Sequence, residues 1–171
     1  IKELQIYLEG AFKFYAAFFG SLLADTTPYV LAKPVYEPNL TAANDENFSN
    51  FLSSKPANGL KFDLQGKFYL QTSGSSGKSK MIEKSLVQMI KESEYLAREL
   101  NFSARNTFFS SVSHRHMFGL TFKVFLPLVL GACVIADELN YPEAILGLEL
   151  ASHVFIASPV LLGALVQSPA A

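Results

Sequence analysis

The stretch Gln71–Ser85, QTSGSSGKSKMIEKS, decides how the chain is interpreted. A run rich in Ser and Gly is typical of a flexible linker. The same composition also suits an anion-binding loop, because glycines let backbone N–H groups converge on the anion, hydroxyls add neutral donors and lysines add charge. The flanking residues favour the second interpretation, since "GKFYLQT" before the stretch is a strand candidate and an amphipathic pattern follows it. The sequence therefore predicts a phosphate-binding loop between a strand and a helix.

The predicted loop supplies three kinds of group for a phosphate. The hydroxyls belong to Thr72, Ser73, Ser75 and Ser76. The turn glycines are Gly74 and Gly77, and the cations are Lys78 and Lys80. Each charge-assisted hydrogen bond contributes about 1.5–3 kcal/mol, so several of them can hold a polyphosphate against its hydration.

The helix predicted after the loop begins with a capping box, in which Ser85 is the N-cap and Gln88 its reciprocal partner. Its buried stripe is predicted to consist of Leu86, Ile90, Ala97 and Leu100.

Strand-like and helical segments alternate along most of the chain. Strands are predicted at 27–32, 66–72, 106–112, 132–136 and 153–158, and helices at 7–23, 86–100, 118–130, 141–150 and 159–168, with surface loop over 38–66. Because parallel neighbouring strands need crossover connections, this alternation predicts a layered α/β fold with a mainly parallel sheet and flanking helices.

Composition excludes several classes of partner. The 171 residues carry a formal net charge of −1, so no charge excess indicates nucleic acid or an anionic membrane surface. The apolar run Phe14–Ala24 is far shorter than the roughly 20 residues that cross a bilayer. The only cysteine, Cys133, is expected to be a buried small hydrophobe, and the absence of a second cysteine fits a reducing, cytoplasmic location.

Two known loop patterns compete for the stretch. "TSGSSGKS" satisfies the end of the G-x-x-x-x-G-K-[ST] pattern but has Thr72 where that pattern requires Gly. The stretch more closely resembles the phosphate loop of the adenylate-forming (AMP-binding) superfamily, approximately T-S-G-[ST]-[ST]-G-x-P-K-G. The matching positions are Thr72, Ser73, Gly74, Ser75, Ser76, Gly77 and Lys80, whereas Ser79 and Met81 depart from the pattern.

A second stretch, Ser113–Ile135, resembles the next landmark of the same superfamily, an H-x-x-G followed by a helix and a strand entry. The matching residues are His116, Gly119, Pro127, Leu128, Gly131 and Ala132. "VFIASPVLLGAL", Val154–Leu165, also resembles the strand and helix that follow in that family. The resemblance is firm from Phe68 to Leu165 and looser before it.

The resemblance implies an AMP-forming acid–thiol ligase similar to acyl-CoA synthetases. In that family a carboxylic acid attacks the α-phosphate of ATP, pyrophosphate leaves, and coenzyme A or a carrier-protein phosphopantetheine accepts the acyl group. By resemblance the phosphate loop and Lys80 bind ATP, Lys80 and His116 are catalytic, and His116, Phe118 and Gly119 lie at the acyl pocket. Mg²⁺ is expected to be bound by residues outside this chain.

The family's later landmarks, a T-E segment, a ribose-binding Asp and a Lys on a small mobile domain, are not found in the sequence. Residues 1–171 are therefore expected to be part of an N-terminal AMP-binding domain, with its phosphate loop at 71–80, and to be inactive alone. Two alternatives stay open. One is a P-loop NTPase or kinase, and the other is a degenerate, non-catalytic fragment that acts as an interaction module.

The sequence says less about the acid substrate and a possible metal site than about the phosphate loop. A cluster of aromatic residues, Phe108, Phe109, Phe118 and Phe122, fits a buried core as well as an apolar pocket. We expect a medium or long acyl chain or an aromatic acid, as in fatty acid metabolism. His114 and His116 alternate as strand neighbours do, but two ligands do not make a zinc site, so no metal site is predicted.

Overall fold

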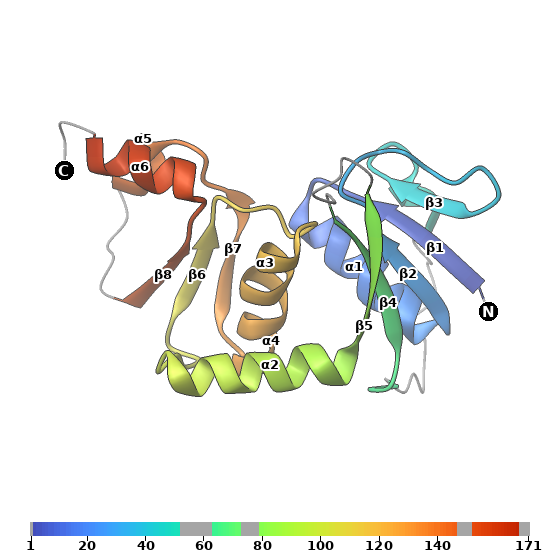
Figure 1. The fold of residues 1–171 in the computed structure, drawn as a ribbon, viewed down its shortest axis with the longest axis horizontal. Coiled ribbons are helices and arrows are strands. Elements are labelled where there is room, and N and C mark those ends of the chain that lie inside the picture. The colour runs from blue at the N-terminus through green and yellow to red at the C-terminus, as the bar shows by residue number, and fades with distance from the viewer. Residues whose placement is uncertain (1, 52–62, 73–78, 147–151, 168–171) are drawn as a thin grey trace. The chain divides into compact units, whose positions relative to one another are not determined.

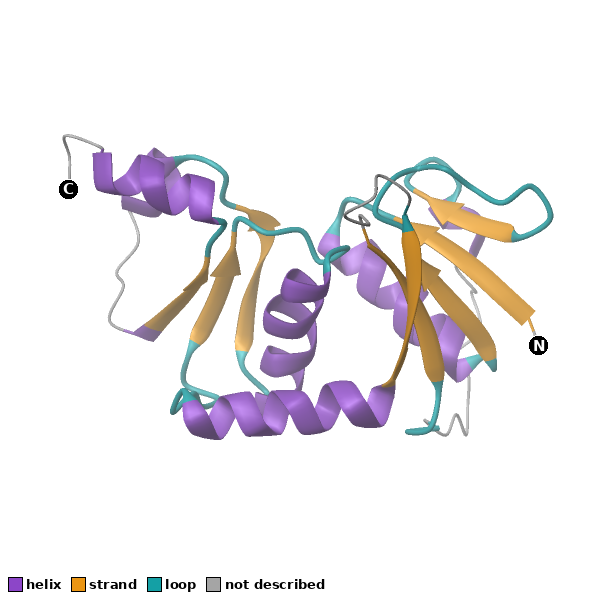
Figure 2. Ribbon diagram, viewed as in Figure 1, coloured by secondary structure: helices purple, strands orange, loops and turns teal. Residues whose placement is uncertain are grey.

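The structure is a computed structural model that describes residues 2–51, 63–72, 79–146 and 152–167. It divides into two units, residues 1–89 and 90–171, with the boundary inside helix α2 (Leu86–Glu99). Each unit contains parallel strands and packed helices (Figure 1, Figure 2). The predicted α/β class with a mainly parallel sheet is confirmed.

The first unit is built on a five-stranded sheet. Its elements are β1 (Lys2–Tyr7), α1 (Ala11–Leu23), β2 (Thr26–Val30), β3 (Thr41–Asn44), the 3-10 helix η1 (Phe48–Phe51), β4 (Lys67–Thr72), β5 (Lys80–Ser85) and the start of α2. The strand order is β3-β1-β2-β4-β5, in which β5 alone runs antiparallel to its neighbour. The carboxyl ends of β1, β2, β3 and β4 therefore meet at one edge of the sheet.

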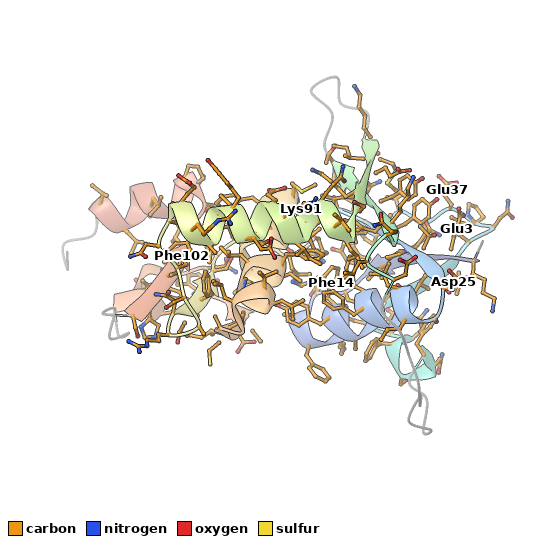
Figure 3. All side chains as sticks on the ribbon, turned by 90° about the horizontal axis from the view of Figure 1, so that it is seen from below. Glu3, Phe14, Asp25, Glu37, Lys91 and Phe102 are labelled. Carbon is orange, nitrogen blue, oxygen red and sulfur yellow. The ribbon has the colours of Figure 1, made fainter. Side chains whose placement is uncertain are left out.

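One face of this sheet is apolar and packs on α1. Strand alternation places Leu4 and Ile6 on that face, and both are buried. Phe14 projects from α1 (Figure 3). Its ring stacks on Phe18 at 5.5 Å, and Phe18 meets Phe68 of β4 edge-on at 5.1 Å. Burying each ring contributes about 1.5–3 kcal/mol, so α1 and β4 share one core.

The opposite face carries polar and aromatic side chains. The rings of Tyr29 and Tyr69 stack at 4.7 Å, and their hydroxyls donate to Glu3 and Glu83, each at 2.8 Å. Burial, and then the hydrogen bond to Glu3, raise the pKa of Tyr29 to about 12.

Two expectations for this unit were wrong. The helix does not begin at Tyr7, because residues 2–7 form β1 and Gly10 is the N-cap of α1. The polar stretch 38–66 is not all loop, since β3 and η1 lie within it. β3 and η1 are both short, and β3 is an edge strand that needs little apolar surface.

The second unit is built on a three-stranded parallel sheet with the order β7-β6-β8. Beyond α2, its elements are β6 (Thr107–Ser110), α3 (Met117–Gly119), the π-helix η2 (Leu120–Phe125), α4 (Leu126–Leu130), β7 (Cys133–Glu138), α5 (Pro142–Leu146), β8 (His153–Ile156) and α6 (Pro159–Gln167). These confirm the predicted order of strands and helices in this half of the chain.

Helices cover both faces of this second sheet. On one face Phe108 packs with Ala97 of α2 and Leu126 of α4, and Phe102 meets its ring edge-on at 5.6 Å (Figure 3). On the other face Phe109 packs with Ile145 of α5 and Leu161 of α6. Adjacent residues of β6 thus supply two separate cores, as strand alternation requires.

Cys133 is exposed, so the expectation that it is buried was wrong. It is the first residue of β7, which is an edge strand, and the apolar run around it therefore faces less protein than a central strand would.

Candidate functional site

The predicted phosphate loop begins and ends on two paired strands. Strands β4 and β5 pair antiparallel, and Thr72 and Lys80 are the last cross-strand partners before the tip. The hydroxyl of Thr72 donates to the carbonyl of Lys80 at 3.3 Å. Five of the predicted phosphate-binding residues lie outside the described residues: Ser73, Gly74, Ser75, Ser76 and Gly77.

The expectation that this loop leads directly into a helix was wrong. The six residues of β5 intervene between the loop and α2. Met81 and Ile82 in this strand are 43% and 40% exposed, so β5 is held by backbone pairing to β4 rather than by an apolar face. Sequence patterns detect such edge strands poorly because their burial does not alternate.

The capping box at the start of α2 is confirmed. The N–H of Gln88 donates to the Ser85 hydroxyl at 3.2 Å, and the N–H of Ser85 donates to Gln88 Oε1 at 3.0 Å. Of the predicted stripe, Leu86 and Ala97 are buried, whereas Leu100 is 46% exposed and lies beyond the end of the helix.

The hairpin loop begins at the carboxyl edge of the first sheet. In open α/β sheets this edge is where ligands bind. The residues that follow β2, Ala32 and Lys33, lie there too, because both donate their backbone N–H to the side chain of Gln71, at 3.0 and 3.4 Å. Gln71 also donates from Nε2 to the hydroxyl of Ser79 at 3.3 Å.

Charged groups lie along the same sheet. Asp45, after β3, accepts from the N–H of Glu9 at 2.9 Å and forms an ion pair with Lys13 at 2.8 Å. On the hairpin, Lys67 pairs with Glu83 at 2.7 Å, and the hydrogen bonds from Lys67 and Tyr69 lower the pKa of the Glu83 carboxyl. Lys80 is exposed and lies at the base of the loop.

The H-x-x-G segment begins α3 in the second unit, after a tight turn in which the N–H of His116 donates to the carbonyl of Ser113 at 3.1 Å. His116 is exposed and precedes α3, and its carbonyl accepts from the N–H of Leu120 at 2.7 Å. Phe118 is 48% exposed, and its ring lies 4.8 Å from that of Phe122. Gly119 is buried, and a Cβ added to it would lie 2.1 Å from the carbonyl oxygen of Ser113. The glycine is therefore required by close backbone approach.

This turn follows β6 at the carboxyl edge of the second sheet. Hydroxyls from two strand ends meet at this edge: Ser111 accepts from the N–H of Ser158 at 3.1 Å, and Ser158 accepts from the N–H of Leu161 at 3.3 Å. Sequence reasoning did not single out these serines, because their contact joins positions 47 residues apart in the chain.

A buried lysine was also missed. Lys123, in the π-helix η2, is fully buried, and burial lowers its pKa, while Glu138 and Asp137 act in the opposite direction. Its position within an apolar stretch, FGLTFKVFLPLVL, is the one sequence signal that could have identified it.

The described residues contain neither a metal-binding cluster nor a membrane-spanning helix. Among them, no three or more His, Cys, Asp or Glu side chains are grouped so that they could hold a metal ion. Within the same part of the chain, no helix is both long and apolar enough to cross a bilayer.

The fold is that of the N-terminal domain of adenylate-forming enzymes, which confirms the resemblance at the level of the fold. MatB from Rhodopseudomonas palustris has a TM-score of 0.80 and 15% identity over 99% of this chain and 41% of that chain. o-Succinylbenzoate CoA synthetase from Bacillus subtilis, in complex with its acyl-adenylate intermediate, has a TM-score of 0.75 and 12% identity over 98% of this chain and 52% of that chain.

A third similar structure is the N-terminal subdomain of Klebsiella oxytoca NpsA in complex with 3-hydroxybenzoyl-AMSN. Its TM-score is 0.63 at 13% identity, over 85% of this chain and 43% of that chain. This chain thus spans about half the length of the structures it matches. No family profile matches the sequence, and no curated protein matches it.

Proposed function

We propose that the chain is part of the N-terminal AMP-binding domain of an ATP-dependent acid–thiol ligase. The observation that carries the proposal is the cross-strand pairing of Thr72 with Lys80, the first and last residues of the T-S-G-S-S-G-x-x-K sequence, in a chain with this fold. Thr72 ends β4 at the carboxyl edge of the parallel strands, where α/β sheets bind ligands.

The proposed reaction has two steps. A carboxylate oxygen of the acid forms a bond to the α-phosphorus of ATP, and the bond from that phosphorus to the bridging oxygen breaks, so pyrophosphate leaves with the electron pair. A thiolate of coenzyme A or of a carrier protein then attacks the acyl carbonyl, and AMP leaves. Both steps need charge on leaving phosphates to be stabilised at fixed positions.

Roles are proposed for each unit by itself. In the first unit, Thr72 and Lys80 are cross-strand partners, and the Lys80 ammonium would meet the β- and γ-phosphates. Ser73, Gly74, Ser75, Ser76 and Gly77 would supply the remaining loop donors. In the second unit, the exposed His116 and Phe118 would meet the carboxylate and the acyl group.

Mg²⁺ is the usual companion of ATP in this chemistry. The described residues do not fit it, because no acidic or imidazole cluster among them could hold a metal ion. No role of this chain's residues in the reaction is therefore assigned through the metal.

The hairpin argues against the P-loop alternative. In a G-x-x-x-x-G-K-[ST] loop the last residues open a helix, whose N–H groups then face the phosphates. Here Lys80–Ser85 form a strand, and the helix begins only at Leu86. This strand supports the proposal that the charge comes from Lys80 rather than from the Lys78–Ser79 pair.

Substitution of the two lysines tests the proposal in the full-length protein. Lys80→Ala should lower the rate of pyrophosphate release about 10²- to 10³-fold with a small change in the KM for the acid, because one charged donor to the transition state is lost. Lys78→Ala is the matched control and should have far less effect. A crippled Lys78→Ala variant with a nearly normal Lys80→Ala variant would contradict the assignment.

The acid is proposed to be a medium or long acyl chain or an aromatic acid. Phe108 and Phe109 are fully buried core residues, which leaves Phe118 and Phe122 as the aromatic pair that can reach an acid. Pyrophosphate exchange measured with a series of aliphatic and aromatic acids identifies the class. Exchange with short polar acids only would contradict an apolar pocket.

A further inference from the structure

Gln71 connects three segments of the first unit through one side chain. It lies on β4, next to Thr72, and its Oε1 accepts from the N–H groups of Ala32 and Lys33 at 3.0 and 3.4 Å. Its Nε2 donates to the hydroxyl of Ser79 at 3.3 Å, on the far side of the hairpin loop. The side chain thus joins the end of β2 to the base of the loop.

The contacts determine the orientation of the amide. Two backbone N–H groups point at one oxygen, which cannot be exchanged for the NH₂ group without losing both hydrogen bonds. The remaining NH₂ group is then directed at Ser79. The backbone pairing of β2 with β4 runs through Val30 and Leu70, so Gln71 continues the connection between these strands after their backbone pairing.

We propose that Gln71 is a positioning residue that holds the entry to β5, Ser79 and Lys80, against the end of β2. This inference rests on the proposed function, in which Lys80 stabilises the departing pyrophosphate. With the contact intact, the Lys80 backbone is fixed from two sides, by Thr72 across the hairpin and by Gln71 through the neighbouring Ser79. A mobile loop base would spread the ammonium over many positions and weaken its effect on the phosphates.

The first experiment measures the contact itself, without any ligand. Hydrogen exchange of the Ala32 and Lys33 amides is compared in wild type, Gln71→Met and Gln71→Glu. Met has a similar length but no acceptor, so exchange at both amides should be at least tenfold faster. Glu keeps an acceptor, so protection should be retained. Tyr69→Phe is the control, because Tyr69 lies on the same strand but donates to Glu83 instead, and it should leave both amides unchanged.

The second experiment measures function in the full-length protein. Gln71→Met should lower the rate of pyrophosphate release at saturating ATP about 5- to 30-fold, the equivalent of losing one or two net hydrogen bonds, and should leave the KM for the acid within about twofold. Gln71→Glu should also lower this rate, because it keeps the β2 contact but places a negative charge beside the departing pyrophosphate. Tyr69→Phe should resemble wild type.

The two experiments distinguish failure of this inference from failure of the proposed function. Unchanged amide exchange in Gln71→Met overturns the inference whatever the activity is. Faster exchange combined with an unchanged rate of pyrophosphate release overturns it as well, because the contact would then be structural only. A wild-type protein that neither binds ATP nor releases pyrophosphate refutes the proposed function, and with it the role of Gln71 towards phosphate.

Discussion

Gly119→Ala tests the turn that carries His116. The added Cβ would lie 2.1 Å from the carbonyl oxygen of Ser113, 2.6 Å from its carbonyl carbon and 3.1 Å from the N of His114. All three are backbone atoms, so no side chain can rotate away, and the turn must move by more than 1 Å to reach the 3.4 Å of ordinary contact. Because φ of Gly119 is −67°, the cost is one of space rather than of backbone conformation.

The magnitude follows from two opposing terms. Overpacking a rigid site costs about 3 kcal/mol or more, and replacing Gly by Ala in a helix returns up to about 1 kcal/mol. The free energy of unfolding should therefore fall by about 2 kcal/mol, which corresponds to a decrease in Tm of roughly 4–8 °C. The rate of pyrophosphate release should also fall in the folded variant, since the displaced turn moves His116.

Gly163→Ala is the matched control in the same unit. Gly163 lies within α6, and nothing lies within 4 Å of the position of its added Cβ. This variant should gain up to about 1 kcal/mol in urea-induced unfolding. If Gly119→Ala has the urea midpoint of wild type, or if both variants are stabilised alike, the close approach of Gly119 to Ser113 is refuted.

Two further predictions concern stability. Ser85→Ala should lower the free energy of unfolding by about 1 kcal/mol, because the Gln88 N–H loses its cap. Urea titration measures this loss, with Ser85→Thr as the control that keeps a hydroxyl. Equal stability of both variants would argue against the capping box. Tyr29 has a pKa raised from 10.0 to about 12, so the folded state keeps a proton that the unfolded state loses. Its contribution is therefore complete below pH 10 and is lost as the pH rises through 12, and Tyr29→Phe should flatten that loss in urea titrations across this range. An unchanged pH dependence in Tyr29→Phe would contradict the assignment.

Much of the second unit could be predicted from sequence because its apolar runs are short and separated by turn residues. "NTFFSSV" and "HVFIAS" became β6 and β8, and Gly131 ends α4 with a φ of 65°, a conformation that glycine adopts easily. The exposure of Cys133 could not be predicted, since the sequence does not say which strand lies at the edge of a sheet.

Strands β5 and β1 of the first unit were missed for different physical reasons. In β5, KMIEKS, the side chains do not alternate between buried and exposed, because the strand depends on backbone hydrogen bonds to β4. In β1, KELQIY, the alternation of Leu4 and Ile6 was obscured because an apolar helix follows after only a few residues. Local pattern alone detects neither situation.

The candidate site was predictable only where a motif is continuous in sequence. Thr72 and Lys80 were identified from the T-S-G pattern, and the structure makes them cross-strand partners. Gln71 was not singled out, since its partner Ala32 is 39 residues away and no local pattern encodes that distance. Lys123 was missed although the apolar stretch around it was a sequence signal of burial, because that stretch does not say which side of the helix faces the core.

The pairing of Thr72 with Lys80 makes the segment between them separable from the rest of the unit. Both anchors are fixed by the β4–β5 ladder, and α2 takes its own start from Ser85 and Gln88 at the opposite end of β5. A change in the number of residues between the anchors is therefore absorbed before it reaches the helix, which a loop leading directly into a helix could not do. Loops of different length and charge could accordingly be grafted between Thr72 and Lys80 to alter the choice of anion without redesign of the surrounding fold.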